Sequence, residues 1–126
     1  MSHCSDVSDI VNEIVSQKTS QERVASFVSN ENAYVRCYVA NYCRLPNILF
    51  KLSNDNSDAV RMHVDLCKYI TKEIILKLSK DKNVYVRLNI VYNSNTSTDL
   101  LKYMIKNDIS EFVRIEAARL LNSCLE

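Results

Sequence analysis

Apolar residues recur along this chain at the spacing of short amphipathic helices, and polar breaks separate one helical stretch from the next. Ile74 and Leu78 belong to one such stretch, residues 81–83 form a polar break, and Val86 and Ile90 continue the pattern. Residues three or four positions apart lie on one face of an α-helix. The same arrangement precedes and follows this segment, and in the first unit it places Tyr42 at the end of the apolar stripe. The pattern therefore predicts an all-α chain built from pairs of helices, each about ten residues long.

A second pattern is superimposed on the first. The dipeptide Val-Arg occurs four times, its arginine recurs at steps of 25, 26 and 27 residues, and an Asp or Asn stands six residues before each arginine. A near-constant period of this kind indicates a repeat architecture. Short helix pairs cannot bury their apolar stripes alone, so we expect successive pairs to stack around one continuous core. The repeated residues are Asn30 and Arg36, Asp55 and Arg61, Asp81 and Arg87, and Asp108 and Arg114.

The constellation Asp-x5-Arg, with Val before the arginine and mostly small or apolar residues three and four positions after it, resembles a HEAT-type repeat. Its period is closer still to that of leucine-rich-repeat variant proteins, and the resemblance covers residues 19–125. It implies a right-handed α-solenoid of about four helix pairs. In such families the Asp and Arg belong to the corner between paired helices, and the second helix of each pair lines the concave surface.

The remaining N-terminal segment carries its own helical pattern, with Ile10, Val11, Ile14 and Val15 apolar. We interpret it as a capping helix that covers the first end of the stack. The chain is therefore divided into residues 1–18, a polar segment with the capping helix, and residues 19–126, the helical repeats, within a single domain.

The corners should consist of Asn, Asp and Ser, because the chain has no glycine and a single proline, Pro46. Pro46 stands where the first turn of a helix tolerates the missing amide hydrogen. The run Thr19-Ser20-Gln21-Glu22 has the spacing of a capping box. Further N-cap residues are expected at Ser57, Thr71, Thr98 and Ser110.

The repeated charged residues have a structural interpretation. A guanidinium at such a corner can reach the carboxylate of its own or the neighbouring unit and can cap exposed carbonyls. Because Asn30 replaces Asp, the first corner is expected to lack the full ion pair and to be the weakest. The predicted structural ladder consists of Arg36, Asp55, Arg61, Asp81, Arg87, Asp108 and Arg114.

Another stripe of the second helices, at positions −2, +2 and +5 from each arginine, is rich in tyrosine. Tyr and Arg combine a large contact area with hydrogen-bonding groups, and they anchor many protein interfaces. The alternative is that several of these tyrosines pack between repeats. Asp65 stands where other units have small or apolar residues, so it needs a ligand, a neighbouring arginine or an exposed rim. The predicted partner-binding residues are Tyr34, Tyr38, Asn41, His63, Asp65, Tyr85, Asn89, Tyr92, Glu116 and Arg119.

Composition limits the chemistry. The chain has five cysteines without short paired spacings and a net charge of +1, which favours a cytoplasmic protein with reduced thiols and no membrane partner. His63 and Cys67 have a spacing that can chelate zinc, but no Cys-x-x-Cys pair accompanies them. We find no phosphate loop or nucleophile elbow. The sequence therefore predicts no catalysis, no cofactor and no metal.

Two functions remain as hypotheses. The first is a non-catalytic protein-binding module, an adaptor, scaffold or inhibitor, that holds a helix or extended segment of another protein. The second is nucleic-acid binding, which requires a basic groove and is disfavoured because most lysines lie on the first helices, expected to be convex. A homodimer through the C-terminal helix is an additional hypothesis. The lysines on or just after the first helices include Lys51, Lys72, Lys77, Lys80, Lys102 and Lys106.

Overall fold

The computed structural model describes residues 6–125, with side chains for residues 6–124. This part of the chain contains α-helices and no strand, which confirms the all-α prediction. The helices are α1 (Val7–Val15), α2 (Gln21–Ala25), α3 (Ala33–Tyr42), α4 (Pro46–Leu52), α5 (Asp58–Asp65), α6 (Lys72–Leu78), α7 (Val84–Tyr92), α8 (Thr98–Asn107) and α9 (Glu111–Leu125).

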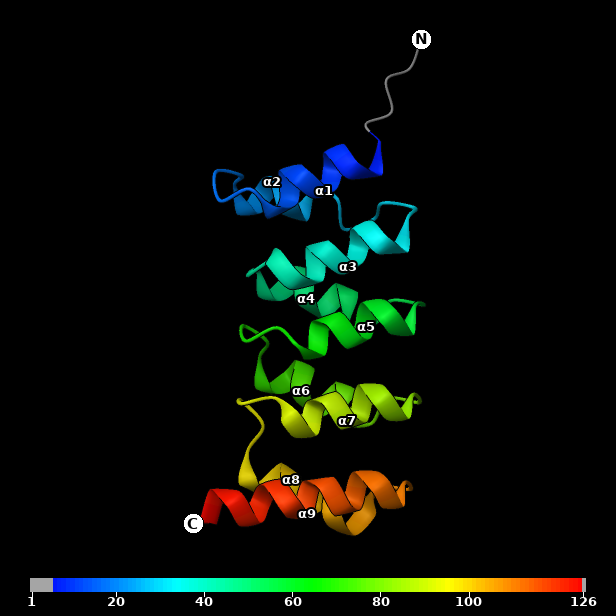
Figure 1. Cartoon of the computed structure of the whole chain (residues 1–126), viewed down its shortest axis with the longest axis vertical. Coiled ribbons are helices and arrows are strands. Elements are labelled where there is room, and N and C mark those ends of the chain that lie inside the picture. The colour runs from blue at the N-terminus through cyan, green and yellow to red at the C-terminus, as the bar shows by residue number, and fades with distance from the viewer. Residues whose placement is uncertain (1–5, 126) are drawn as a thin grey trace.

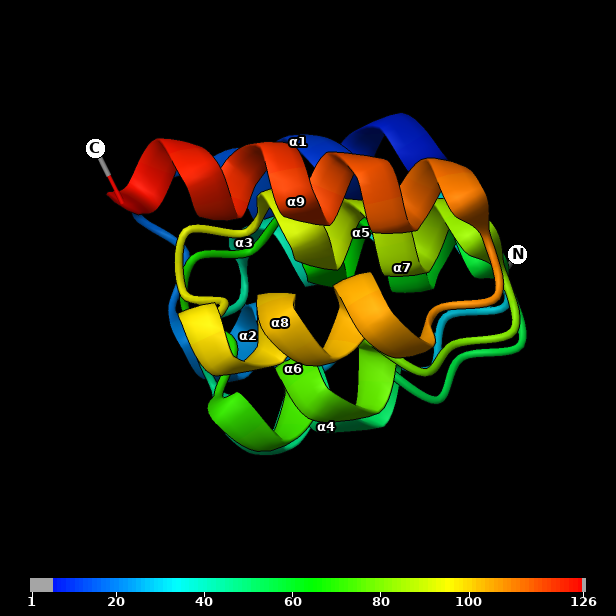
Figure 2. The ribbon, with the colours of Figure 1, turned by 90° about the horizontal axis from the view of Figure 1, so that it is seen from below.

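The helices form two rows. The odd-numbered helices follow one another along the long axis, and each contacts the next in its row: α1 with α3, α3 with α5, α5 with α7, and α7 with α9 (Figure 1). The even-numbered helices form a second layer, which Figure 2 shows from below, along the long axis of the stack. In that view α1 and α9, at the two ends, are displaced to the same side relative to α5 and α7. The stack therefore bends, and the odd row lies on the inner side of the bend.

The hydrophobic core lies between the two rows. The valine before each repeated arginine is fully buried, namely Val35, Val60, Val86 and Val113. Leu49, Leu52, Ile74, Leu78 and Met104 face them from the even helices and are at most 2% exposed. Tyr42, which the helical pattern places on the core stripe of α3, is instead 43% exposed.

Side chains cap the N-termini of three even helices, α2, α6 and α8. The hydroxyls of Ser20, Thr71 and Ser97 each accept the backbone amide hydrogen three residues further on. This satisfies an amide that has no partner within its helix. The expected cap at Thr98 is wrong, because Ser97 occupies that position. Thr19 is also not the cap of α2, because its hydroxyl donates to the Glu13 carbonyl oxygen at 2.6 Å.

Three of the even helices are shorter than the ten residues expected, with 5 residues in α2 and 7 in each of α4 and α6. Each ends at a serine, Ser26, Ser53 or Ser79. The serine hydroxyl donates to the carbonyl oxygen three residues earlier, at 2.5, 2.5 and 2.6 Å. Such a local bond competes with continued helix, so the chain leaves the helix one turn earlier than the apolar pattern suggests.

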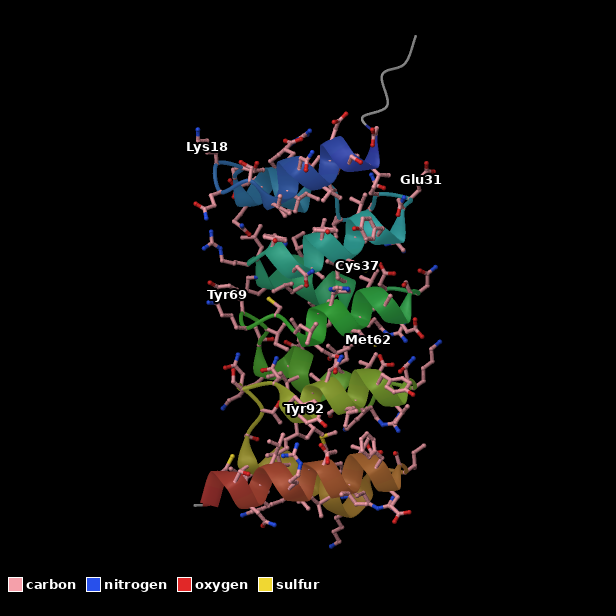
Figure 3. All side chains as sticks on the ribbon, in the orientation of Figure 1. Lys18, Glu31, Cys37, Met62, Tyr69 and Tyr92 are labelled. Atoms are coloured by element: carbon pink, nitrogen blue, oxygen red, sulfur yellow. The ribbon has the colours of Figure 1, made fainter. Side chains whose placement is uncertain are left out.

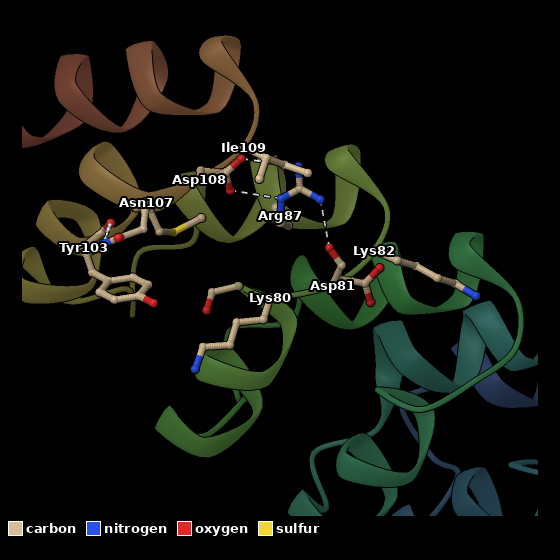
Figure 4. A pocket seen from close by; sticks show the side chains of 10 residues that line it. Lys80, Asp81, Lys82, Arg87, Tyr103, Asn107, Asp108 and Ile109 are labelled. Carbon is tan, nitrogen blue, oxygen red and sulfur yellow. Dashed lines mark hydrogen bonds and ion pairs between the residues drawn. The ribbon is translucent and has the colours of Figure 1, made fainter.

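The arginine ladder connects consecutive corners. Arg36, Arg61 and Arg87 each place Nε and Nη2 on the two carboxylate oxygens of the aspartate in the next corner, with Nε–Oδ2 distances of 2.8, 2.8 and 2.9 Å. The Nη1 group of each donates to the backbone oxygen six residues before it. Figure 4 shows Arg87 lying between Asp81 and Asp108 in this way. Each arginine thus fixes two successive corners.

The expectation that the first corner lacks a full ion pair is wrong. Arg36 has a complete bidentate pair with Asp55, and Asn30 supplies a backbone oxygen to Arg36. The ladder arginine that lacks a carboxylate partner among the described residues is Arg114, at the other end of the ladder. The reason is that each arginine pairs with the corner after its own, and α1, which precedes Asn30, contains no arginine.

We predict that replacing Arg87 by Met lowers the free energy of unfolding by about 3–5 kcal/mol, because Asp108 then becomes a buried carboxylate without its cation. Arg114→Met is the matched control, since Arg114 has the same Nη1 bond to a corner carbonyl but no ion pair. Urea unfolding of both variants measures the difference. Equal losses of stability in the two variants would contradict the structural role of the ion pair.

Candidate functional site

Exposed aromatic side chains lie along the odd row. Tyr34, Tyr85 and Phe112, at the position two residues before the arginine, are 57%, 61% and 55% exposed. They do not pack between units, so that alternative is wrong for these three residues. Figure 3 shows the side chains of this row, with Tyr92 labelled on α7. We call this set the aromatic surface; it consists of Tyr34, Tyr38, Tyr42, Leu66, Tyr85, Tyr92 and Phe112.

The tyrosines of α3 are held against one another. Tyr34 and Tyr38 have ring centroids 5.1 Å apart in an edge-to-face arrangement, and their hydroxyl oxygens are 3.2 Å apart. Tyr38 and Tyr42 are stacked at 6.2 Å with an interplanar angle of 8°. The hydrogen bond with Tyr34 raises the pKa of Tyr38. Residues four apart on a helix contact each other in this way, so the three rings present one oriented aromatic group.

Tyr42 was missed as a member of this group by the sequence reasoning. The apolar spacing of α3 assigns it to the core stripe, yet the helix ends at Tyr42 and its ring lies half outside. The useful signal is its position four residues after Tyr38, which itself lies four residues after Tyr34.

Polar side chains join neighbouring odd helices at this surface. The Nδ1 atom of His63 on α5 lies 3.0 Å from Oδ1 of Asn41 on α3. Burial lowers the pKa of His63, which favours the neutral imidazole at neutral pH. The two residues occupy positions +5 and +2 in consecutive units, so the predicted residues Asn41 and His63 meet across one junction.

The same two positions meet again between α7 and α9. The Tyr92 hydroxyl donates to the Glu116 carboxylate, and Arg119 forms an ion pair with Glu116 at 2.9 Å. Hydrogen bonds, first from Arg119 and then from Tyr92, lower the pKa of Glu116. Exposed ion pairs of this kind add little stability, but here they orient Tyr92. Their charges offset each other, leaving this part of the surface without net charge.

The last two predicted tyrosine-stripe residues, Tyr85 and Asn89, lie on α7 between these two groups. Tyr85 is exposed, and Asn89 is half-buried beside a pocket of about 240 Å³ that Leu66, Tyr92 and Asn93 also line. The aromatic surface therefore has a shallow hollow between α5 and α7.

Asp65 borders the hollow between α5 and α7, but its side chain is not exposed there. It is 0% exposed, and neither carboxylate oxygen has a hydrogen-bond partner among the described residues. Both expected accounts, a neighbouring arginine and an exposed rim, are wrong. Burial, followed by the nearby charge of Asp81, raises the pKa of Asp65 to about 9, while Arg61 acts in the opposite direction. The carboxyl group is accordingly protonated at neutral pH, because a neutral acid costs less to bury than a carboxylate.

Most lysines lie on or just after the even helices, but Lys68 follows α5 and lines the hollow beside Leu66 and Tyr92. Lys80 and Lys82 line a pocket of about 440 Å³ between consecutive corners (Figure 4) and another of about 400 Å³ at the preceding corner. Lys77 donates to Ser53 and Asn54 of the preceding unit. Burial lowers the pKa of Lys77. Some of these lysines therefore connect even helices rather than form a free basic face.

The cysteines and carboxylates form no cluster suited to a metal ion: among residues 6–124, no three His, Cys, Asp or Glu side chains are placed to hold one. Cys37, Cys43 and Cys67 are buried thiols whose pKa values burial raises, whereas Cys124 is exposed. Cys4 lies outside the described residues. None of the described helices has the length and apolar character required to span a membrane.

Comparison with known proteins adds no relative to this picture. No family model, no curated protein and no solved structure matches the chain. Function has to be inferred from the geometry of the molecule itself.

The buried carboxyl group of Asp65 predicts a pH dependence of stability. An unfolded Asp titrates near about 3.9, whereas Asp65 in the folded chain titrates at about 9. Between these values the folded state holds one more proton, so its stability falls as the pH rises, by up to about tenfold in the folding equilibrium constant per pH unit.

The isosteric variant Asp65→Asn removes this titration. Its free energy of unfolding, measured in urea at several pH values, should rise steadily relative to that of the wild type from about pH 4 to about pH 9. A difference between the two proteins that stays constant with pH would show that Asp65 is ionised in the folded chain.

Proposed function

We propose that this chain is a HEAT-like helical-repeat solenoid that binds another protein through the aromatic surface, without catalysis, as an adaptor, scaffold or inhibitor. The observation that carries the proposal is the row of exposed, oriented aromatic side chains on the inner side of the bend. Contiguous apolar surface rimmed by polar groups is typical of protein interaction sites.

The chemistry of the surface favours a protein segment with apolar side chains. Tyr34, Tyr85 and Phe112 each expose more than half of their side chain, and tyrosine hydroxyls can bond to a backbone that crosses them. The rings of α3 are already held by their mutual contacts. Binding therefore costs less side-chain entropy than it would with mobile rings.

The charge distribution argues against nucleic acid at the same surface. Affinity for a phosphate backbone comes from cations that displace counterions. Here Arg119 is paired with Glu116, and the depressed pKa of His63 favours its neutral form. The lysines of α4, α6 and α8 lie in the other row. A helix or extended segment of a protein, rather than DNA or RNA, is the proposed ligand.

We expect the double substitution Tyr34→Ala/Tyr85→Ala to weaken binding of the partner at least about tenfold, because exposed tyrosines are frequent hot spots. Both side chains are more than half exposed, so the fold should persist. Tyr103→Ala is the matched control: Tyr103 is 52% exposed, but it lies on α8 in the even row.

The measurement is affinity capture from a lysate of cells that express the protein, with and without nuclease, followed by titration of the captured protein. A partner retained after nuclease treatment, held by Tyr103→Ala and lost from the double variant, supports the proposal. Retention by all three proteins would remove the aromatic surface as the site. Loss on nuclease treatment would instead indicate a nucleic-acid ligand.

A further inference from the structure

Helix α9, at one end of the stack, carries apolar and small residues at the same positions as the other odd helices, which bury them. Position +1 from the arginine faces the following unit: Cys37 and Leu88 are 7% and 9% exposed there, and Met62 is half-buried. The corresponding residue of α9, Ile115, is 54% exposed. At this position α9 therefore exposes an apolar side chain to solvent, whereas the equivalent side chains of the other units are buried or half-buried.

Position +4 behaves in the same way. Ala40, Asp65 and Val91 are 0%, 0% and 2% exposed, and each of the helices that carry them contacts the next odd helix. Ala118 of α9 is only partly buried. A small residue at this position allows a neighbouring helix to approach closely, and nothing in the described chain does so.

Arg114 completes this face. Its Nη1 group donates to the Asp108 carbonyl oxygen at 2.6 Å, as in the other ladder arginines. Its Nε and Nη2 groups have no carboxylate partner among the described residues, whereas those of Arg36, Arg61 and Arg87 each have one. The face therefore combines an apolar side chain, a small residue and a guanidinium in the orientation that receives an aspartate.

The opposite end of the same row carries an aspartate in a related turn. Asp6 is exposed at the start of α1, and its Oδ1 accepts the amide hydrogen of Ser8. Asp55, Asp81 and Asp108 also accept the amide hydrogen two residues later, at 2.9 Å each, but Asp55 and Asp81 stand two residues before the N-cap of their helix, whereas Asp6 is itself the N-cap of α1. In those corners the second carboxylate oxygen of the aspartate accepts from the arginine Nε, and the turn at Asp6 likewise uses Oδ1 alone.

We propose that copies of this chain associate head to tail, with α9 of one copy packed on α1 of the next and with the Asp6 carboxylate of that second copy accepting the Nε and Nη2 hydrogens of Arg114. The odd row then continues from one copy into the next. This contact is heterologous, so each added copy leaves one free end and the assembly is open-ended. The aromatic surface lies along the side of the row and takes no part.

An isologous dimer through α9 is less favourable on charge. It would not bring the Asp6 carboxylate to Arg114, so the Nε and Nη2 donors of both copies would stay without the acidic partner that the other ladder arginines have. The head-to-tail arrangement places opposite charges together. The two arrangements also differ in whether Asp6 matters, which makes them separable.

The test is sedimentation equilibrium of the full chain from about 1 µM to about 1 mM. The mean mass of the wild type should rise with concentration. Arg114→Asp alone and Asp6→Arg alone should each weaken association by about thirtyfold or more, because each places like charges at the junction. Asp99→Arg is the control for net charge, at an exposed site in the first turn of α8, and should associate like the wild type.

Mixing the two single variants provides the decisive arm. Each junction between the two variants then pairs an acidic residue with a basic one, so the mixture should associate more strongly than either variant alone. A wild type that stays monomeric over the whole range overturns the proposal. So does association that depends on Arg114 but not on Asp6, which would indicate the isologous dimer.

Discussion

The fold depends on arginines that each bind two consecutive corners. A guanidinium carries five N–H donors, and burying it is favourable only when those donors meet acceptors. Arg61 does so with both carboxylate oxygens of Asp81 and the backbone oxygen of Asp55. Because the bidentate pair fixes distance and orientation together, it sets the position of one odd helix relative to the next. That spacing in turn decides which side chains meet across a junction, such as Asn41 with His63 and Tyr92 with Glu116.

The corners achieve this without glycine. No described residue has a positive φ, and the turns are closed by aspartate or asparagine side chains that accept the amide two residues later. Asp81 and Asp108 therefore serve the turn and the ladder with one carboxylate. Asn30 closes its turn in the same way, since its Oδ1 accepts the Asn32 amide hydrogen at 2.9 Å, but its side chain carries no charge. Its position follows α1, which has no arginine to pair, so a neutral side chain is sufficient there.

The regular part of the molecule could be predicted from periodicity, because burial of the valines before each arginine and the apolar spacing of α1 depend on local pattern alone. Periodicity could not show that each arginine pairs with the aspartate of the following corner. The contact between Arg36 and Asp55 depends on the distance that packing sets between two corners. Tyr42 was wrongly assigned to the core, because helix α3 ends at this residue and leaves its ring half exposed. Asp65 was misjudged because sequence reasoning treats a carboxyl group as charged, whereas burial makes it neutral. The aromatic residues of the site were identified by position, but their mutual contacts follow from the fold.

A double-mutant cycle on Arg61 and Asp81 tests most directly whether the ladder couples neighbouring units. Arg61→Met, Asp81→Asn and the combined variant are unfolded in urea, and the coupling free energy is taken from the four stabilities. The account predicts a favourable coupling of about 1–3 kcal/mol, because each single substitution leaves a buried partner unpaired. Additive effects, with a coupling indistinguishable from zero, would contradict it and would mean that apolar packing alone holds the helices in register.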